Sequence, residues 1–269
     1  MTQHCGTIAL VGLPNAGKSS LLNALIGQKL APVTYKANTT RRVLNGVLTR
    51  ENAQFIFVDT PGMNDKGTLP DTDILLWIAD AKREIVRPPV KLPSSTVLVL
   101  NQIDRFEDKA QMLPVIQRWH EVLEPDLILP ISARTGEGLE ELIKILSKKL
   151  PEREFLFDKD ALTDASEREL VAELIREKAL LALKDEIPYS LNVVIESFDE
   201  SRREGSQKNI VDISANLNLA RESHKPIVIG KGGSKLKEIG QMARLELEKL
   251  LGCQVMLRLF VRVKKPGTI

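Results

Sequence analysis

Cysteine and histidine are scarce in this 269-residue chain. Its only cysteines, Cys5 and Cys253, stand far apart, and its three histidines, His4, His120 and His224, form no cluster. Such isolated residues exclude a disulfide framework and provide no spacing typical of a transition-metal site. We therefore expect a protein of a reducing compartment.

Long apolar runs are also missing. No segment has the roughly 20 apolar residues that a membrane-spanning helix needs, and the short polar stretch 1–6 has no signal-peptide pattern. Hydrophobic residues make up 43% and charged residues 28% of the chain, which is ordinary for globular proteins and allows a core in each of two domains. The expectation is a cytoplasmic protein with two domains.

Charge is distributed unevenly. Residues 151–220 hold 9 basic and 16 acidic residues, whereas 221–269 hold 11 basic and 4 acidic, a net charge of +7 in a chain whose total is +2. A basic end segment suggests a polyanionic partner. From charge alone, a solvated charged face is an equally good explanation.

Residues 1–150 alternate short apolar runs with helical patterns. The apolar runs predict strands at Thr7–Val11, Val43–Arg50, Gln54–Val58, Ile74–Ile78, Thr96–Leu100 and Leu127–Ile131. Helical spacing predicts helices at Ser19–Ile26, Leu113–Leu123 and Gly138–Leu150. This alternation predicts an α/β domain whose mostly parallel sheet is covered on both faces.

The polar segment 151–163 is predicted to link this domain to a smaller α+β domain at 164–269. There the pattern predicts the order helix, strand, strand, helix, helix, strand. The elements are expected at Asp164–Lys184, Leu191–Phe198, Asn209–Leu219, a short turn after Pro226, Ser234–Leu251 and Gln254–Val263, with Gly252 ending the last helix.

The strongest motif is Gly12-Leu-Pro-Asn-Ala-Gly17-Lys18-Ser19, a G-x-x-x-x-G-K-S loop between a predicted strand and a predicted helix. Its glycines let backbone N–H groups surround phosphate oxygens, and the helix N-terminus adds positive potential. Lys18 is placed to reach the β and γ phosphates, and the Ser19 hydroxyl to bind Mg²⁺. A glycine-rich turn without ligand remains the plain alternative.

Two further strand ends carry matching motifs. Asp59-Thr-Pro-Gly62 follows one strand, where the carboxylate of Asp59 is placed to hold Mg²⁺ through water and the Gly62 N–H to contact a γ phosphate. Asn101-Gln-Ile-Asp104 follows another, and the carboxylate of Asp104 can accept both hydrogen bonds from the N1–H and N2–H₂ edge of guanine. Adenine lacks that donor pair and would leave the acceptor unpaired.

Ser132-Ala133-Arg134, after the next strand, is placed to offer a backbone N–H to guanine O6. Each of these short motifs is weak alone. Their order along the chain, each at the end of a strand, makes the set specific for a guanine nucleotide.

With these motifs the first domain resembles the Era family, bacterial ribosome-assembly GTPases of the translation-factor-related branch. The resemblance covers nearly the whole chain and rests on the P-loop, Asn38-Thr-Thr-Arg41, Asp59-Thr-Pro-Gly62 and Pro130-Ile-Ser-Ala133. It implies a P-loop GTPase domain and makes the Thr-Thr segment switch I, with Thr40 as a further Mg²⁺ ligand.

The predicted nucleotide site is therefore Gly12, Leu13, Pro14, Asn15, Ala16, Gly17, Lys18, Ser19, Ser20, Asp59, Thr60, Pro61, Gly62, Met63, Asn101, Gln102, Asp104, Ser132, Ala133 and Arg134. Within the predicted site and switch I, Lys18, Thr40 and Gly62 are assigned to catalysis, and Ser19, Thr40 and Asp59 to the metal.

Several residues bear on mechanism. Met63 stands where Ras-like enzymes carry a water-orienting Gln, which predicts slow hydrolysis. Asn15 matches the position that binds a stimulating monovalent cation in part of the family, so the resemblance implies K⁺ besides Mg²⁺.

Gln102 departs from the family, which has at this position a Lys whose stem lies over the guanine ring. Because Gln is shorter and uncharged, nucleotide affinity is expected to fall while Asp104 keeps the base preference.

The region after Gly62 is a larger departure from the family. Only 42 positions separate Asp59 from Asn101. The stretches 63–73 and 83–95 carry glycine and proline and do not read as helices. The chain is therefore expected to have lost or shortened both crossover helices, including the switch II helix, which puts the coupling of hydrolysis to a switch II movement in question.

The basic end segment carries Gly230-Lys231-Gly232-Gly233 between two helical patterns, with Lys235 just after. In an RNA-binding KH fold such a G-x-x-G loop clamps the backbone of single-stranded nucleotides, so we predict RNA binding by Gly230, Lys231, Gly232, Gly233 and Lys235. The apolar Ile227, Val228, Ile229 and Ile239 are either part of a base-binding groove or simply core. The resemblance implies a type II KH domain and, as ligand, the 3′ region of small-subunit ribosomal RNA.

Three functions follow as hypotheses. The leading one is a slow GTPase that binds small-subunit RNA during 30S ribosome maturation. The second is an RNA-binding chaperone whose G domain binds nucleotide but hydrolyses it poorly. An ATP-using P-loop enzyme is opposed by Asp104. We further expect a monomer in the cytoplasm, with a peripheral contact to the inner face of the membrane left open.

Overall fold

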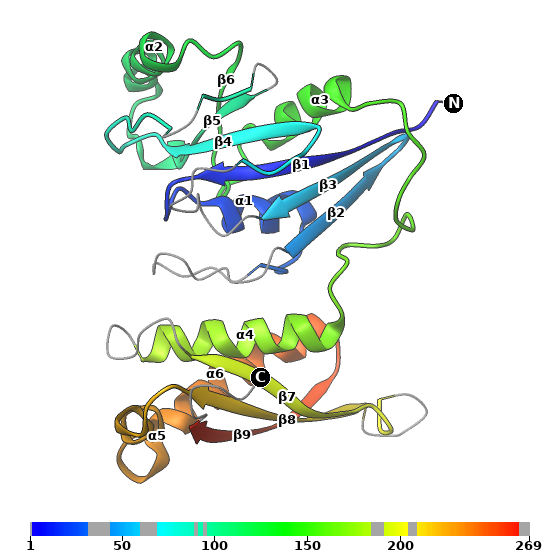
Figure 1. Ribbon diagram of the computed structural model, residues 1–269, viewed down its shortest axis with the longest axis vertical. Helices are drawn as coiled ribbons and strands as arrows, with labels where there is room; N and C mark the ends of the chain where they lie inside the picture. The colour runs from blue at the N-terminus through cyan, green and yellow to red at the C-terminus, as the bar shows by residue number, and fades with distance from the viewer. Residues whose placement is uncertain are drawn as a thin grey trace. The chain divides into compact units, whose positions relative to one another are not determined.

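A computed structural model describes residues 2–31, 44–59, 69–88, 91–93, 96–183, 191–203 and 209–263. The chain forms two compact units, 1–164 and 165–269, shown in Figure 1. Each unit has its own sheet.

The first unit is built on a six-stranded sheet of order β2-β3-β1-β4-β5-β6. Its strands are β1 (His4–Gly12), β2 (Leu44–Arg50), β3 (Ala53–Asp59), β4 (Ile74–Asp80), β5 (Val97–Asn101) and β6 (Ile128–Pro130). All neighbours run parallel except the hairpin β2–β3. The central strands β1, β4 and β5 are almost wholly apolar because a parallel sheet buries both faces.

In the described part of the first unit, three helices flank the sheet. They are α1 (Lys18–Ile26), α2 (Met112–Leu123) and α3 (Leu139–Lys149), and the short 3₁₀ turns η1 (Ile103–Arg105) and η2 (Lys109–Gln111) precede α2. α2 buries Trp119 against alternate residues of the central strands, such as Val11 and Trp77. The intervening residues of those strands point to the opposite face, where α1 packs so closely on β2 that a Cβ at Gly46 would lie 2.5 Å from Leu22 Cδ1.

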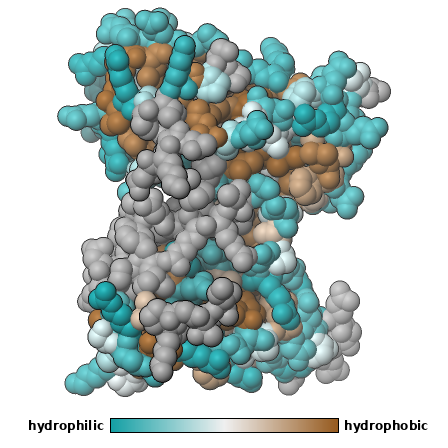
Figure 2. Space-filling view, viewed as in Figure 1, coloured by the Kyte–Doolittle hydropathy of each residue, from teal (hydrophilic) through white to brown (hydrophobic). Residues whose placement is uncertain are grey.

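The sheet face under α2 is covered partly by loops. Leu69, Ile85 and Leu92 pack against the same apolar cluster, and the described residues of 69–73 and 81–96 form no helix. The expected loss or shortening of the crossover helix is thus confirmed for the described residues of 81–96, whereas most of the first connection, 60–68, lies outside the described residues. Figure 2 shows apolar surface on this unit, whose exposed side chains include Val86 (45%) and Leu113 (65%).

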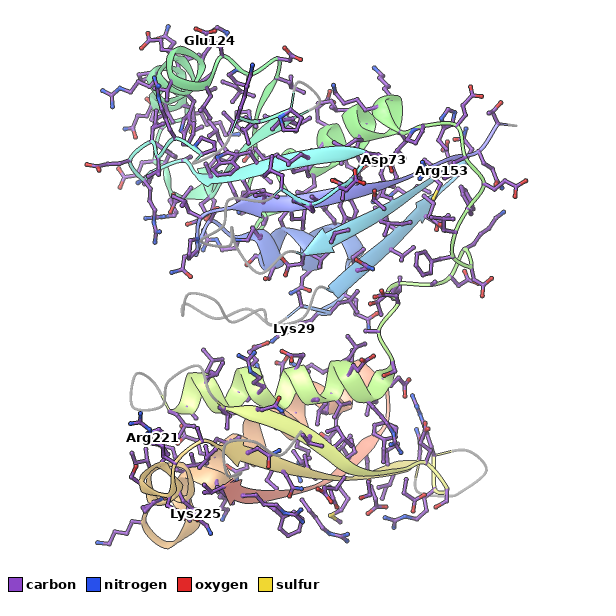
Figure 3. The ribbon with its side chains drawn as sticks, in the orientation of Figure 1. Lys29, Asp73, Glu124, Arg153, Arg221 and Lys225 are labelled. Carbon is purple, nitrogen blue, oxygen red and sulfur yellow. The ribbon has the colours of Figure 1, made fainter. Side chains whose placement is uncertain are left out.

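Residues 151–164, predicted mainly as a linker, lie along the first unit. Asp73, at the start of β4, accepts hydrogen bonds from the Thr7 backbone N–H (2.8 Å) and hydroxyl (3.0 Å) and pairs with Arg153 at 3.4 Å, as Figure 3 shows for the carboxylate and guanidinium. The Gln54 side chain accepts from the Phe157 N–H at 3.0 Å, and the Thr163 hydroxyl donates to the β2 backbone at 2.7 Å. The segment therefore has fixed contacts with the sheet.

The second unit has the order α-β-β-α-α-β that the sequence predicted. Its sheet is β7-β8-β9, with β7–β8 antiparallel and β8–β9 parallel. The elements are α4 (Glu167–Ala182), β7 (Asn192–Asp199), β8 (Ile210–Leu219), η3 (Glu222–His224), α5 (Lys225–Ile229), η4 (Lys231–Gly233), α6 (Ser234–Leu251) and β9 (Gln254–Val263).

The core of the second unit lies between its helices and one face of the sheet. It includes Val171, Val211, Ile239 and Leu247, all wholly buried. Helix α4 begins with a capping box in which Ser166 and Glu169 satisfy each other's backbone N–H groups. Within the described part of the chain, no helix combines the length and apolar character that a bilayer crossing demands.

Candidate nucleotide-binding and RNA-binding sites

The predicted nucleotide motifs converge at the carboxyl edge of the first sheet. In the ladder Gly12 lies beside Ile78, and Asp80 beside Asn101, so the loops after β1, β4 and β5 start at one level. Asp59 ends β3 on the other side of β1. This crevice outside the strand ends is where open α/β sheets bind ligands.

Lys18 lies in the first turn of α1 and points back over the P-loop. Its ammonium donates to the carbonyls of Gly12 at 3.0 Å and Leu13 at 3.1 Å. Burial lowers the pKa of Lys18, and the nearby Asp59 carboxylate counteracts that shift. A cation held among carbonyls and partly desolvated is well suited to bind phosphate oxygens.

Ser19 and Asp59 meet as the metal prediction requires. The Ser19 hydroxyl donates to Asp59 Oδ2 at 2.9 Å, while Oδ1 of the same fully buried carboxylate has no partner in the described part of the chain. Burial raises the pKa of Asp59 to about 6, against the opposing effects of Ser19 and Lys18. A buried, under-coordinated oxygen beside a hydroxyl fits Mg²⁺, which prefers hard oxygen ligands.

Asn101 ties the segment 101–104, here called the guanine loop, to the P-loop (residues 12–19). Its Nδ2 donates to the Ala16 carbonyl at 3.0 Å, and its Oδ1 accepts from the backbone N–H groups of Gln102 at 2.8 Å and Ala133 at 3.0 Å. One buried side chain therefore joins three of the predicted motifs. The next residue, Gln102, has a left-handed backbone (φ 68°) and donates from Nε2 to the Asn15 carbonyl at 3.2 Å.

Asp104 is held in its charged form. Its Oδ1 accepts from the Ser132 hydroxyl at 2.6 Å, and its Oδ2 pairs with Arg134 at 2.6 Å. The Ser132 hydrogen bond and the Arg134 charge hold its pKa below the usual range despite partial desolvation. Since the Arg134 side chain is 76% exposed, it can leave the carboxylate free to accept from a purine edge.

The remaining predicted residues divide into two groups. Leu13 and Asn15 are exposed on the P-loop, Pro14 lies between them, and Ser20 follows in the first turn of α1. Thr40, Thr60, Pro61, Gly62 and Met63, together with the segment Asn38–Arg41, lie outside the described residues.

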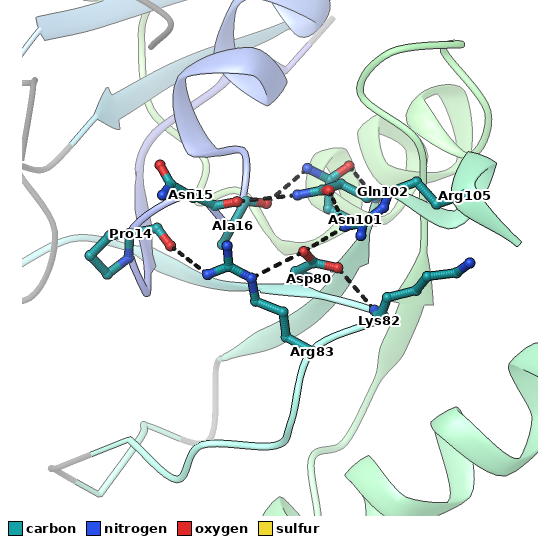
Figure 4. A network of polar contacts seen from close by, with 9 residues as sticks. All are labelled: Pro14, Asn15, Ala16, Asp80, Lys82, Arg83, Asn101, Gln102 and Arg105. Carbon is teal, nitrogen blue, oxygen red and sulfur yellow. Dashed lines mark hydrogen bonds and ion pairs between the residues drawn. The ribbon is translucent and has the colours of Figure 1, made fainter. Parts of the chain in front are cut away.

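Sequence reasoning missed three residues that brace this edge. The buried carboxylate of Asp80 pairs with Arg105 at 2.8 Å and with Arg83 at 3.4 Å, and Arg83 donates to the Pro14 carbonyl at 3.4 Å. Figure 4 shows how they link the P-loop to the guanine loop. The sequence held a partial signal, because Asp80 lies two residues after the predicted strand Ile74–Ile78, but nothing in it marked the arginine partners.

Gly17 tests how tightly these loops fit. A Cβ there would lie 2.3 Å from Asn101 Nδ2, and the backbone is left-handed at φ +91°. We expect Gly17→Ala to weaken GDP binding at least tenfold and to lower stability by more than the roughly 1 kcal/mol of a left-handed Ala. Thermal unfolding and fluorescent-GDP titration measure both effects.

The matched control is Gly27→Ala, which has φ +76° and no neighbour within 4 Å of its Cβ. It should show the backbone penalty alone and keep wild-type GDP affinity. Equal behaviour of the two variants would disprove the role given to the Gly17–Asn101 contact.

The glycine loop of the second unit joins α5 to α6. Gly230, Gly232 and Gly233 all have positive φ, and a Cβ at Gly232 would meet nothing within 4 Å. The backbone is thus open to a close ligand. Lys231 is exposed, whereas Lys235 donates to Glu238 at 2.8 Å on its own helix, which reduces the attraction predicted for Lys235.

A groove of about 430 Å³ runs from this loop between α6 and β9. Leu236, Leu257 and Leu259 give it apolar walls, and it is also lined by Gly233, Lys237, Gly240, Gln241 and Arg244. Val228 and Ile239 are wholly buried in the core, which decides the role of these two in favour of core; Ile227 is partly buried against the same core, and Ile229 is half-buried. Helical spacing had not distinguished the groove face of α6 from its core face.

Comparison with known protein families gives the same two domains as the two structural units. Residues 7–149 match the family described as 50S ribosome-binding GTPase, and 186–268 match the KH domain family. The fold and the strand-end motifs therefore define a P-loop GTPase domain followed by a KH domain.

Similarity to individual proteins extends over nearly the whole chain. GTPase Era of Syntrophus aciditrophicus is 43% identical, covering 98% of this chain and 91% of the relative, and GTPase Era of Trichlorobacter lovleyi is 39% identical over 99% and 95%. The chain belongs to the Era family of GTPases.

Two solved structures are similar throughout. Era in complex with MgGDPNP and nucleotides 1506–1542 of 16S ribosomal RNA superposes with a TM-score of 0.86 at 36% identity, covering 98% of this chain and 95% of that one. A variant of Aquifex aeolicus Era bound to GDP and AlF4⁻ gives 0.84 at 35% identity over the same shares.

Proposed function

We propose that this chain binds and slowly hydrolyses GTP, and that it binds the 3′ region of small-subunit ribosomal RNA during maturation of the 30S subunit. The observation that carries the proposal is Asn101, whose buried amide joins the P-loop, the guanine loop and the loop at Ala133 at one place. Phosphate and purine contacts are thereby held at a fixed separation.

The chemistry is attack of water on the γ phosphate. Lys18 and the backbone N–H groups of the P-loop stabilise the charge that develops on the phosphate oxygens. Mg²⁺, when bound, would add further neutralisation; Ser19 and Asp59 are placed to hold it, with Thr40 proposed as a further ligand from the family resemblance. The Gly62 N–H is proposed, from the sequence, to contact the γ phosphate. Met63 offers no side chain to orient water, which supports a slow rate.

Asn15 supports a further proposal, stimulation by K⁺. It lies exposed on the P-loop with a left-handed backbone at φ 64°, in the position the family resemblance assigns to the cation. We expect GTP turnover to be faster in potassium than in sodium buffer. Equal rates would disprove the cation role.

The competing function is an RNA chaperone that holds nucleotide and barely hydrolyses it. The sheet face is covered at Leu69, Ile85 and Leu92 by loops and not by helix. This favours the chaperone, because the shortened switch II region expected from the sequence gives nucleotide hydrolysis less means to drive a conformational change. Turnover of radiolabelled GTP with and without the RNA separates the two functions. A rate at background under both conditions would favour the chaperone.

Guanine recognition is tested separately by Asp104→Asn. We expect GDP affinity to fall on the order of a hundredfold and affinity for xanthosine diphosphate to rise, because xanthine carries a carbonyl where guanine has its N2 amino group. Calorimetric titration with both nucleotides measures this. The control is Glu107→Gln, an exposed carboxylate nearby; unchanged GDP affinity in Asp104→Asn would refute the assignment.

We also propose that the protein works as a monomer in the cytoplasm, the compartment of its proposed RNA partner. Its two cysteines, Cys5 and Cys253, are buried and form no disulfide, which fits a reducing compartment. Peripheral contact with the inner face of the membrane stays a prediction from the family resemblance. Sedimentation and cell fractionation measure these properties.

A further inference from the structure

Gln102 occupies the place where the family motif has Lys, and its side chain is held at both ends. Its Nε2 donates to the Asn15 carbonyl of the P-loop at 3.2 Å. Its Oε1 accepts from Arg105 at 2.8 Å. A side chain that is shorter than Lys and uncharged thus still connects the guanine loop to the phosphate loop.

Arg105, in the turn η1, provides the positive charge that position 102 has lost. Its NH1 nitrogen donates both to Gln102 Oε1 and to Asp80 Oδ2, each at 2.8 Å. The Asp80 side chain is only 3% exposed, so a firmly placed counter-charge is required there. Asp80 therefore fixes Arg105, and Arg105 fixes Gln102, as Figure 4 shows.

The arrangement also determines which way the Gln102 amide points. With the amide reversed, its oxygen would face the Asn15 carbonyl and its NH₂ group would face the Arg105 guanidinium. Both contacts would then join like groups, acceptor to acceptor and donor to donor. Arg105 therefore selects the orientation in which Nε2 binds the P-loop.

We propose that Gln102 and Arg105 act together as the substitute for the missing lysine at the base end of the nucleotide site. Arg105 is a positioning residue for guanine nucleotides: it holds the Gln102 amide against the P-loop and brings positive charge to the loop that carries Asp104. This inference rests on the proposed guanine-nucleotide site.

The test is a cycle of Arg105→Gln, Gln102→Lys and the double variant, measured by fluorescent-GDP titration. Arg105→Gln should weaken GDP about tenfold, the size of one charge-assisted hydrogen bond. In Gln102→Lys the new ammonium repels Arg105, so we expect little or no gain. The double variant, with a lysine and no competing arginine, should regain wild-type affinity.

One readout separates positioning from mere structural support: competition by inorganic triphosphate, which has no base, should be the same in Arg105→Gln and wild type. The melting temperature should fall somewhat in this variant, because the buried Asp80 then keeps the more distant Arg83 as its remaining cationic partner among the described residues. Arg118→Gln, an exposed arginine on α2, controls for the loss of one positive charge and should bind GDP as wild type does.

Unchanged GDP affinity in Arg105→Gln, or a double variant as weak as that single variant, would overturn the inference. Equal loss of GDP and triphosphate affinity would also overturn it, because the effect would not be at the base. Absence of saturable GDP binding by the wild-type protein is a different result, since it refutes the proposed function itself.

Discussion

Asp59→Asn is expected to make the nucleotide-free protein more stable at pH 7 while abolishing its magnesium-dependent nucleotide binding. The carboxylate is fully buried, and burial raises its pKa to about 6 from a reference of 3.8. Keeping it charged at pH 7 therefore costs roughly 3 kcal/mol. Because Lys18 loses its counter-charge in the variant, the net gain should be about 1–3 kcal/mol.

The pH dependence has a defined sign. Between about pH 4 and 6 the folded state binds a proton at Asp59 that the unfolded state does not, so stability of the nucleotide-free protein should fall as pH rises through this window. The variant lacks that slope. Chemical unfolding at several pH values, without Mg²⁺, measures the difference.

Function should change in the opposite direction. Metal binding needs the ionised carboxylate, so GTP turnover in Asp59→Asn should drop on the order of a hundredfold or more, and wild-type affinity for Mg²⁺-nucleotide should weaken below pH 6. Asp126→Asn, an exposed carboxylate after α2, should change neither property. A variant that loses stability and keeps magnesium dependence would contradict both assignments.

The sequence located the nucleotide site because its motifs are local and stand at strand ends. Once β1, β3 and β5 lie in one parallel sheet, Asp59 and Asn101 come to the same edge as the P-loop. The spacing of apolar residues likewise predicted α6 and β9 with their observed bounds. Both successes depend on patterns within a short stretch of chain.

The role of Asp80 could not be predicted in the same way. Arg83 is only three residues from Asp80, but outside a helix this spacing predicts no contact, and Arg105 comes from the separate loop after β5. The same holds for Arg153 and Thr163, whose contacts with Asp73 and β2 place a supposed linker on the sheet. Polar pairs between distant segments depend on the fold being known first.

The largest effect in the second unit is expected from a charge placed in the glycine loop. Gly232 has φ +59° and open space around it, so Asn or Asp, which tolerate this conformation best among residues with side chains, should leave the fold intact. Gly232→Asp places a carboxylate where an RNA phosphate would approach. We expect affinity to fall at least about tenfold.

The comparison of Gly232→Asn with Gly232→Asp separates bulk from charge. The probe is an RNA matching nucleotides 1506–1542 of 16S ribosomal RNA, the segment in the related complex, titrated by fluorescence anisotropy at several salt concentrations. If Lys231 and the loop backbone hold a phosphate, the Asp variant should bind with a salt slope smaller by about one. The Asn variant should lie between it and wild type.

Gly252→Asp is the matched control, because Gly252 has φ +64°, equally open surroundings and a place at the other end of α6. The same charge just beyond the opposite end of α6 should leave RNA affinity near that of wild type. If Gly252→Asp weakened binding as much as Gly232→Asp, the effect would come from the net charge of the domain, and the loop would lose its claim to contact RNA. A difference at Gly232 alone would instead place a phosphate at the loop, since only a short-range contact distinguishes two otherwise equivalent sites.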